Sequence, residues 1–247
     1  MIYAKQSKVV LALVLVLTLI ITCCVVSAAS EEQAGSSSTA ADRLIFGDSN
    51  GDGVVNSVDY ATLKYYVDGK INALPYDKAG YTMDVNADGV INSNDVDLVR
   101  NFLLGNISSF PADEIINGMP ETVFEYKYEN YAWGYQFAVL DIDNEGNIHV
   151  SGIFPENLPI TKIPKIEVQE KYLDLLKASE QPLSNKVQKG ADAGAYTYTG
   201  YIPGSEKLQQ VLLALEGDYR QQNLSPYAAS LVQWLKQIVN DEYEGWE

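Results

Sequence analysis

The sequence has little cysteine, histidine or positive charge, and each shortage excludes a class of function. Cys23 and Cys24 are its only cysteines and His149 its only histidine among 247 residues. The 17 lysines and arginines are outnumbered by 33 aspartates and glutamates, giving a formal net charge of −16 at pH 7. Nucleic-acid binding requires a basic face that neutralises phosphates, so this composition argues against a nucleic-acid partner and favours cations or neutral ones. An apolar fraction of 47% is nonetheless sufficient for a packed core.

Both cysteines lie in an apolar run near the amino terminus. Lys5 and Lys8 precede this uncharged run, residues 9–26, and small residues follow it up to Ala28. The order is typical of a secretory signal peptide, which we place at residues 1–28. A retained membrane anchor is the alternative, because a run of this length can just span a bilayer. Cleavage would leave an exported chain with no membrane span and no cysteine, which excludes disulfides and thiol chemistry.

Composition divides the remaining chain into four segments. Residues 29–43 are small and polar, which is typical of a flexible linker. Residues 44–107 contain an internal repeat, and residues 108–120 form a connector that contains two prolines. Residues 121–247 have the length of a separate domain. We therefore predict a multidomain protein.

The repeat consists of two twelve-residue segments offset by 36 residues. The sequence DSNGDGVVNSVD at 48–59 matches DVNADGVINSND at 84–95, and each is followed by a short helical pattern that ends at a glycine. Ca²⁺ takes about six to eight oxygen ligands, which side chains at loop positions 1, 3, 5 and 12 and the carbonyl at position 7 can supply. Asparagine at position 9 binds directly or through water, and glycine at position 6 permits the turn. The predicted ligands of two calcium ions are Asp48, Asn50, Asp52, Val54, Asn56 and Asp59, and Asp84, Asn86, Asp88, Val90, Asn92 and Asp95.

The charge of the repeat supports a metal role. Residues 44–107 contain nine aspartates and four lysines or arginines, a net charge of −5. The clustered carboxylates repel one another without ions, so we predict that this segment folds only with calcium. The alternative is a pair of aspartate- and asparagine-rich turns that bind no metal.

The two loop–helix units resemble a type I dockerin, the all-α module by which secreted proteins of anaerobic bacteria attach to cohesin domains of a cellulosome scaffoldin. Aspartate at position 12, as at Asp59 and Asp95, is common in dockerins. The resemblance implies that loop positions 10 and 11 and a basic residue on the following helix contact cohesin. It also implies that the dockerin can bind cohesin in two orientations. The mismatch between Val58 and Asn94 at position 11 conflicts with equal use of both orientations. The cohesin contacts implied are Ser57, Val58 and Lys64 in the first unit, and Ser93, Asn94 and Arg100 in the second.

The segment 121–247 matches no family by its motifs, and its patterns predict an α+β domain. Alternation predicts a strand at 122–129, and two further apolar stretches around a turn at 143–147 predict a hairpin. Residues 195–202 form another candidate strand. Helical spacing is present near 168–176, 208–215 and 225–238. We therefore expect a small antiparallel sheet with about three helices.

The sequence does not decide whether this domain binds metal, catalyses a reaction or binds sugar. Residues 141–146 imitate the start of a calcium loop, but the simpler interpretation is a hairpin turn. Aspartates and glutamates are too numerous to select a catalytic pair, and His149 is best explained as structural. The aromatic residues Tyr131, Trp133, Tyr135, Tyr196, Tyr198 and Tyr201 form either a sugar-stacking face or strand core, of which strand core is favoured.

These patterns together predict an extracellular, cell-surface-associated cellulosome component. Its dockerin would bind calcium and a scaffoldin cohesin, and would deliver residues 121–247 to plant polysaccharide degradation. That domain is either a non-catalytic carbohydrate- or protein-binding module or a small carbohydrate-active hydrolase, an O-glycosyl hydrolase or esterase.

Overall fold

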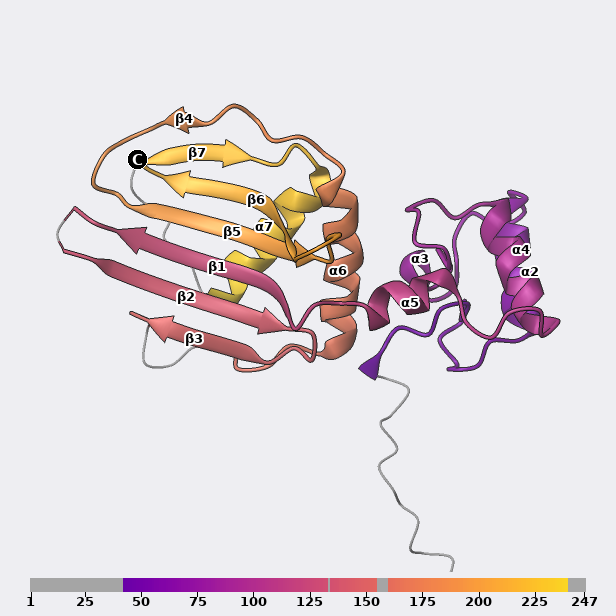
Figure 1. Ribbon diagram of the computed structural model, residues 1–247. Helices are drawn as coiled ribbons and strands as arrows, with labels where there is room; N and C mark the ends of the chain where they lie inside the picture. The colour runs from indigo at the N-terminus through magenta and orange to yellow at the C-terminus, as the bar shows by residue number, and fades with distance from the viewer. Residues whose placement is uncertain (1–41, 133, 155–159, 240–247) are drawn as a thin grey trace, which may run out of the picture. The chain divides into compact units, whose positions relative to one another are not determined.

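The structure is a computed structural model that describes residues 42–132, 134–154 and 160–239 (Figure 1). The predicted signal peptide, nearly all of the predicted linker and Trp133 lie outside the described residues. None of the helices in the described ranges is both long and apolar enough to cross a membrane.

The repeat region is helical, as predicted. Each calcium-loop candidate leads into a helix of 11 residues, and the two helices contact each other. Leu63 and Val99, one from each helix, are fully buried between them. The helices of this region are α2 (Ser57–Val67), α3 (Ala79–Thr82), α4 (Ser93–Leu103) and α5 (Pro111–Asn117).

The segment predicted as a connector contains α5 and contributes to the core of the repeat region. Phe110 is buried and stacks on Phe102 of α4 with ring centroids 4.7 Å apart. Ala112, at the second position of α5, is fully buried in the same apolar cluster. The hydrophobic core of the repeat region therefore continues past the second repeat into α5.

The carboxyl-terminal segment forms one antiparallel sheet of seven strands, which is larger than the small sheet predicted (Figure 1). Its strand order is β3-β2-β1-β5-β6-β7-β4, and the neighbouring strands pair antiparallel. Strands β1 to β3 are followed by α6, strands β4 to β7 are followed by α7, and the two sets of strands meet at the β1–β5 pair. The elements are β1 (Thr122–Asn130), β2 (Gln136–Asp143), β3 (Ile148–Gly152), α6 (Lys165–Ser179), β4 (Val187–Gln188), β5 (Ala195–Ile202), β6 (Gln209–Gly217), β7 (Tyr219–Gln222) and α7 (Pro226–Val239).

The helix predicted near 208–215 is wrong, because these residues form most of β6. A register shift between Tyr198 and Thr199 leaves Leu213 as an extra residue opposite β5. The bulge buries both Leu213 and Ala214 in addition to Val211. A bulge breaks the two-residue period of a strand, so the apolar spacing imitates that of a helix.

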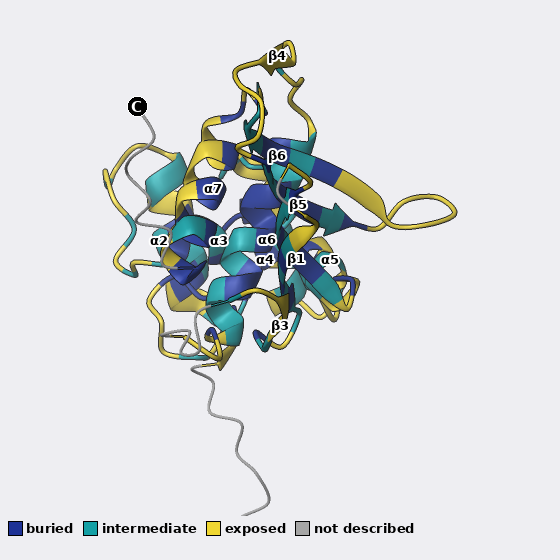
Figure 2. Cartoon of the chain, turned by 90° about the vertical axis from the view of Figure 1, so that its left-hand side faces the viewer, coloured by how far each residue is buried: buried dark blue, intermediate teal, exposed yellow. Residues whose placement is uncertain are grey.

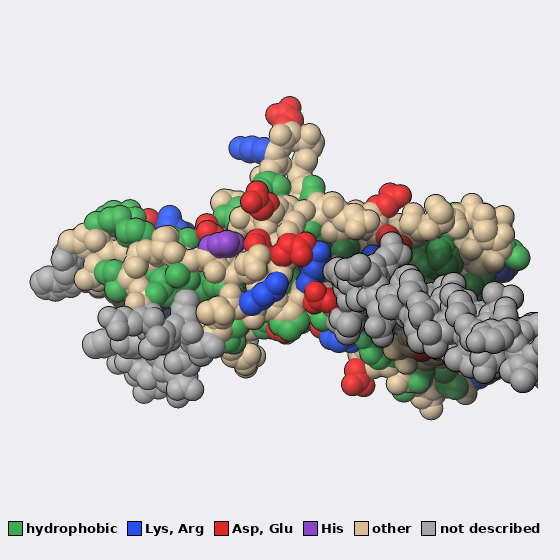
Figure 3. Space-filling view, turned by 90° about the horizontal axis from the view of Figure 1, so that it is seen from below, with side chains coloured by type: hydrophobic (Ala, Val, Ile, Leu, Met, Phe, Trp, Pro, Cys, Tyr) green, Lys and Arg blue, Asp and Glu red, His purple; other side chains and the backbone are tan. Residues whose placement is uncertain are grey.

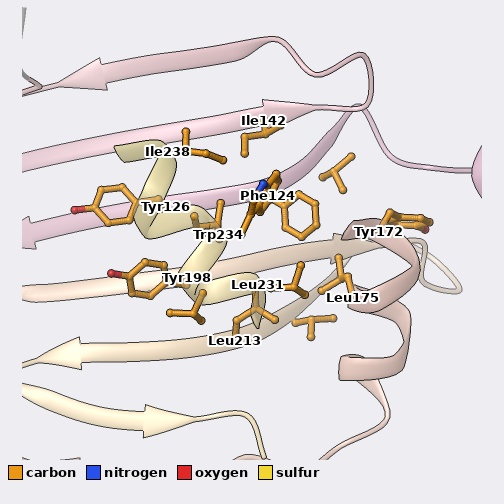
Figure 4. Close-up of a cluster of buried hydrophobic side chains, with 14 of the residues drawn as sticks. Phe124, Tyr126, Ile142, Tyr172, Leu175, Tyr198, Leu213, Leu231, Trp234 and Ile238 are labelled. Carbon is orange, nitrogen blue, oxygen red and sulfur yellow. The ribbon is translucent and has the colours of Figure 1, made fainter. Parts of the chain in front are cut away.

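Helices α6 and α7 cover one face of the sheet and enclose the core of this domain (Figure 4). Phe124 packs edge-on against Trp234 with ring centroids 5.1 Å apart, and the Trp234 indole donates to Glu167 at 2.7 Å. Buried positions along α7 alternate with exposed ones, whereas those along β1 are interspersed with half-buried ones (Figure 2). The opposite face of the sheet is not covered by any helix within the described residues (Figure 1).

Candidate metal centre and partner-binding surface

The first loop folds around the carboxylate of Asp48. Asp48 is buried, and its Oδ1 accepts hydrogen bonds from the backbone N–H groups of Asn50 at 3.1 Å and Gly51 at 2.7 Å. Its Oδ2 accepts one from Gly53 at 2.8 Å. Gly53 has φ +83°, a conformation that favours glycine, which explains the residue at loop position 6.

The last position of the first loop is also buried, and it has donors on both of its oxygens. Oδ1 of Asp59 accepts from the N–H and the hydroxyl of Ser49, both at 2.9 Å. Oδ2 accepts from the N–H of Asn56 at 2.8 Å. The protein itself therefore satisfies this carboxylate in part.

The second loop leaves two buried carboxylate oxygens without any donor. Oδ2 of Asp84 accepts from Gly89 at 2.9 Å, and Oδ2 of Asp95 accepts from Asn92 at 2.8 Å. Oδ1 of each aspartate is buried and has no hydrogen-bond partner among the described residues. The residue equivalent to Ser49 is Val85, whose side chain has no hydroxyl. These two oxygens belong to loop positions 1 and 12, and a cation bound in the loop would satisfy both.

The pKa values of these two aspartates reflect the same lack of partners. Burial raises the pKa of the Asp84 carboxyl, and the nearby Asp88 charge adds to the increase. Burial likewise raises the pKa of Asp95, with a further contribution from the charge of Asp84. An ion of charge +2 would offset both effects, so the residues present fit calcium.

The remaining predicted ligands lie on the outer rim of each loop in matching arrangements. Asn50 Nδ2 donates to Asp52 at 2.9 Å, and Asn86 Nδ2 donates to Asp88 at 2.8 Å. The carbonyls of Val54 and Val90 accept from the following asparagines, at 3.4 Å and 3.0 Å. Across the described ranges, no three side chains drawn from His, Cys, Asp and Glu gather as a metal site. A calcium ion in these loops would need amide and carbonyl oxygens as well as carboxylates.

Asn56 and Asn92, predicted as position-9 ligands, also have a structural role that the sequence analysis missed. Each is the N-cap of the next helix, accepting from the N–H of Val58 at 2.7 Å or of Asn94 at 2.8 Å. Asp59 and Asp95 complete the two capping boxes. The Asn-x-x-Asp spacing could have indicated this arrangement, because an N-cap residue paired with an acidic group three positions later is a helix-start pattern.

The residues implied to contact cohesin lie at equivalent, exposed places in the two units. Ser57 and Ser93 begin α2 and α4, and Val58 and Asn94 follow them on the surface. The basic residues are exposed and pair with nearby acidic residues, one at the C-cap of α2 and one within α4. Lys64 pairs with Asp68 at 3.3 Å, and Arg100 pairs with Asp97 at 3.1 Å.

In the carboxyl-terminal domain, the structure separates the tyrosines into two groups. Tyr198 is fully buried and Tyr196 half-buried, and both pack against tyrosines of β1 in the core, as the strand-core interpretation predicts. Tyr131 and Tyr135 are exposed at the end of the β1–β2 hairpin. Tyr201 is half-buried on β5.

The apparent start of a third calcium loop is a hairpin turn. Asp143 accepts from the N–H groups of Glu145 at 2.9 Å and Asn147 at 2.8 Å. Gly146 has φ +83°, and a Cβ there would lie 2.1 Å from the Ile163 carbonyl oxygen. Hydrogen bonds within the turn therefore explain this sequence without a metal.

Two loop–helix units with cation-fitting aspartates define a calcium-binding docking module, and comparison with known proteins identifies its family. The model of the dockerin type I domain family matches residues 46–104, and no family matches the carboxyl-terminal region. The chain therefore belongs, through residues 46–104, to the type I dockerin-containing proteins. Type I dockerins bind calcium. No curated protein matches the chain.

Among solved structures, similar chains are dockerin complexes. One is the third cohesin of ScaC with the ScaB dockerin of Acetivibrio cellulolyticus, mutated in its N-terminal helix and displaying a type I interaction. It has 43% identity over 29% of this chain and 99% of that chain, with a TM-score of 0.29. Another is the Coh-OlpC–Doc435 complex of Clostridium thermocellum, with 42% identity over 27% of this chain and 96% of that chain, and a TM-score of 0.27.

Proposed function

We propose that this protein is a secreted, extracellular cellulosome component, held at the cell surface when its dockerin binds a scaffoldin cohesin. The observation that carries the proposal is the pair of unpartnered buried oxygens on Asp84 and Asp95, within a family-matched dockerin segment. The similar solved structures are cohesin–dockerin complexes, which supports the choice of partner.

Calcium would be held at two places, one in each loop. The carboxylates at positions 1 and 12 of each loop come from the loop start and the following helix, so a bound ion would tie the loop to that helix. Calcium supplies positive charge that offsets the carboxylate repulsion. The capping boxes at Asn56 and Asn92 hold the two helix starts, which orients Ser57 and Ser93 for contact with cohesin.

The cohesin surface would consist of the two equivalent sets of exposed residues on α2 and α4. Val58 differs from Asn94, so the apolar first unit and the polar second unit offer cohesin different contacts. One orientation is therefore expected to dominate for a given cohesin.

The carboxyl-terminal domain would be delivered to plant polysaccharide as a non-catalytic binding module. A second candidate is a polysaccharide hydrolase, favoured by Glu125 and Asp141, which face each other across β1 and β2. Burial raises the pKa of both carboxyls, and a raised pKa suits the general acid of such a pair. Release of reducing ends or acetate from cellulose and xylan by the full chain would distinguish hydrolysis from binding.

Docking is tested by size-exclusion chromatography of the full chain, expressed without residues 1–28, with a panel of type I cohesins. We expect co-elution with at least one cohesin in calcium and separate elution in EGTA. The double substitution Val58→Asp with Asn94→Asp should abolish co-elution, because it places like charge on the predicted contact surface. Glu114→Gln, at an exposed position of α5, is the matched control. Separate elution from every cohesin in calcium would contradict the proposal.

A further inference from the structure

On the uncovered face of the sheet, charged and polar side chains lie opposite one another on neighbouring strands. Glu125 of β1 lies opposite Asp141 of β2, which in turn lies opposite His149 of β3. Two residues further along β1, Lys127 lies opposite Val139. We call the side of the sheet that carries Glu125, Lys127, Glu129, Phe137, Asp141, His149 and Tyr201, opposite the helices, the open face.

Exposed aromatic rings form a row at one end of the open face. Tyr131 and Tyr135 lie with ring centroids 4.9 Å apart and planes at 32°, and Tyr135 stacks on Phe137 at 5.4 Å and 18°. Tyr131 is 71% exposed and Tyr135 is 57% exposed. Two adjacent tyrosines left this open contribute little to the core, so their regular arrangement calls for another explanation.

Hydrogen bonds to a neighbouring carboxylate fix the orientation of the two tyrosine rings. Both tyrosine hydroxyls donate to Oε1 of Glu129, from Tyr131 at 3.4 Å and from Tyr135 at 3.2 Å. Glu129 is held in turn by Lys127, whose Nζ lies 2.9 Å from the other carboxylate oxygen. The rings are therefore positioned before any ligand arrives, which lowers the entropy cost of binding.

Hydrogen-bonding groups continue from the aromatic row along the strands. Tyr201 hydrogen-bonds to Glu125, and Gln210 donates to the Tyr201 hydroxyl at 3.3 Å. Asp141 and His149 extend the polar strip toward the β3 edge, where acidic side chains gather beside the single histidine (Figure 3). Apart from the paired Lys127, this strip offers hydrogen-bond acceptors and neutral donors.

We propose that the open face binds a neutral polysaccharide chain, with Tyr131, Tyr135 and Phe137 stacking on sugar rings and Glu125, Asp141 and Tyr201 bonding to hydroxyls. Aromatic surfaces pack against the C–H faces of sugars, while carboxylate oxygens accept from sugar hydroxyls. An anionic polymer would be repelled by Glu125 and Asp141 and by the net charge of −16. The proposal rests on the proposed function, and it names the surface and the ligand class of the delivered domain.

Affinity electrophoresis of the full chain, expressed without residues 1–28, through gels containing soluble neutral polysaccharides tests this assignment. The probes are hydroxyethylcellulose, xylan and glucomannan, with polygalacturonate as the anionic comparison. We expect retardation by at least one neutral polymer and none by polygalacturonate. Tyr131→Ala and Tyr135→Ala should each weaken binding about twofold to tenfold, since an aromatic contact contributes about 0.5–1.5 kcal/mol. Tyr219→Ala, an exposed tyrosine on β7, is the matched control and should leave binding unchanged.

Polysaccharide binding and cohesin docking are tested by separate measurements. Retardation that is lost in the Tyr131 and Tyr135 variants, with unchanged melting temperatures, supports the open face as the site. No retardation by any neutral polymer, or equal retardation of all variants, overturns it. Cohesin co-elution of the same preparations reports on the proposed docking independently, so either idea can fail while the other stands.

Discussion

At the residue scale, the carboxylates of the two calcium loops differ in the hydrogen-bond donors that they have without metal. Ser49 gives Asp59 two donors, whereas Val85 gives Asp95 no side-chain donor, and Oδ1 of Asp95 has no partner. Leaving a buried polar atom unpaired costs about 1–3 kcal/mol. The second loop should therefore depend on calcium more strongly than the first.

Hydrogen–deuterium exchange measured in calcium and in EGTA tests this asymmetry. We expect chelation to speed exchange in residues 84–95 more than in residues 48–59, because only the second loop keeps two unpartnered carboxylate oxygens. Equal acceleration in the two loops, or greater acceleration in the first, would contradict the explanation. Re-addition of excess calcium controls for irreversible unfolding.

At the element scale, the sequence predicted those elements whose periodicity is undisturbed. The strands at 122–129 and 195–202, the 143–147 turn and the helices at 168–176 and 225–238 are confirmed, because their alternation or helical spacing is regular. The β6 strand was missed because the bulge at Leu213 disturbs its alternation. The size of the sheet was also underestimated, since β4 and β7 have only two and four residues.

The same limit applies to the candidate site. Loop spacing alone was enough to name the aspartates at positions 1 and 12, because a twelve-residue calcium loop has a fixed ligand order. Which oxygens lack donors could not be predicted, since this depends on how Ser49 and Val85 face the closing carboxylate. The tyrosines of the open face were named as a possible sugar-stacking surface, but its polar part was hidden, because the partners of Glu125 depend on strand order rather than on sequence distance.

Helix α7 provides a test of the carboxyl-terminal core. Leu235 is fully buried beneath the sheet, while Gln237 on the same helix is exposed. Leu235→Ala should lower the free energy of unfolding by about 2–5 kcal/mol through the cavity it creates. Gln237→Ala should leave it nearly unchanged, and urea denaturation followed by tryptophan fluorescence measures both. Similar small losses in both variants would contradict the assigned packing.

At the scale of the whole molecule, helix α6 links the dockerin to the sheet domain. Leu173 belongs to the apolar cluster of the dockerin, and the Leu44 N–H donates to Gln169 at 2.8 Å. The Tyr81 hydroxyl donates to Asp174 at 3.1 Å, and Lys78 pairs with Glu170. These contacts give the two domains a shared apolar and polar interface.

The buried Asp174 gives this interface a pH dependence. Burial raises the pKa of its carboxyl above the ordinary value, although the Tyr81 hydroxyl and the charges of Lys177 and Lys171 oppose the increase. A raised folded-state pKa means that its stabilising contribution is full below the unfolded pKa and is lost as pH rises through the folded pKa. Ionised Asp174 therefore destabilises the folded protein near pH 7.

Asp174→Asn should raise the melting temperature at pH 7, because the amide can still accept from Tyr81 without a buried charge. The difference from wild type should shrink as pH falls toward 4, and calorimetry in saturating calcium measures both values. Tyr81→Phe should instead lower stability by about 1 kcal/mol or more, since it leaves Asp174 without this donor. A lower melting temperature for Asp174→Asn at pH 7 would contradict the stated effect of burial.

Calcium binding by both loops is measured by isothermal calorimetry of the full chain after its metal has been removed with chelator. We expect two ions bound per chain, and one ion after either Asp59→Ala or Asp95→Ala, while the exposed Asp97→Asn keeps both. A titration that shows no binding heat in the wild-type chain, or a stoichiometry unchanged by loss of either loop-closing aspartate, would contradict it.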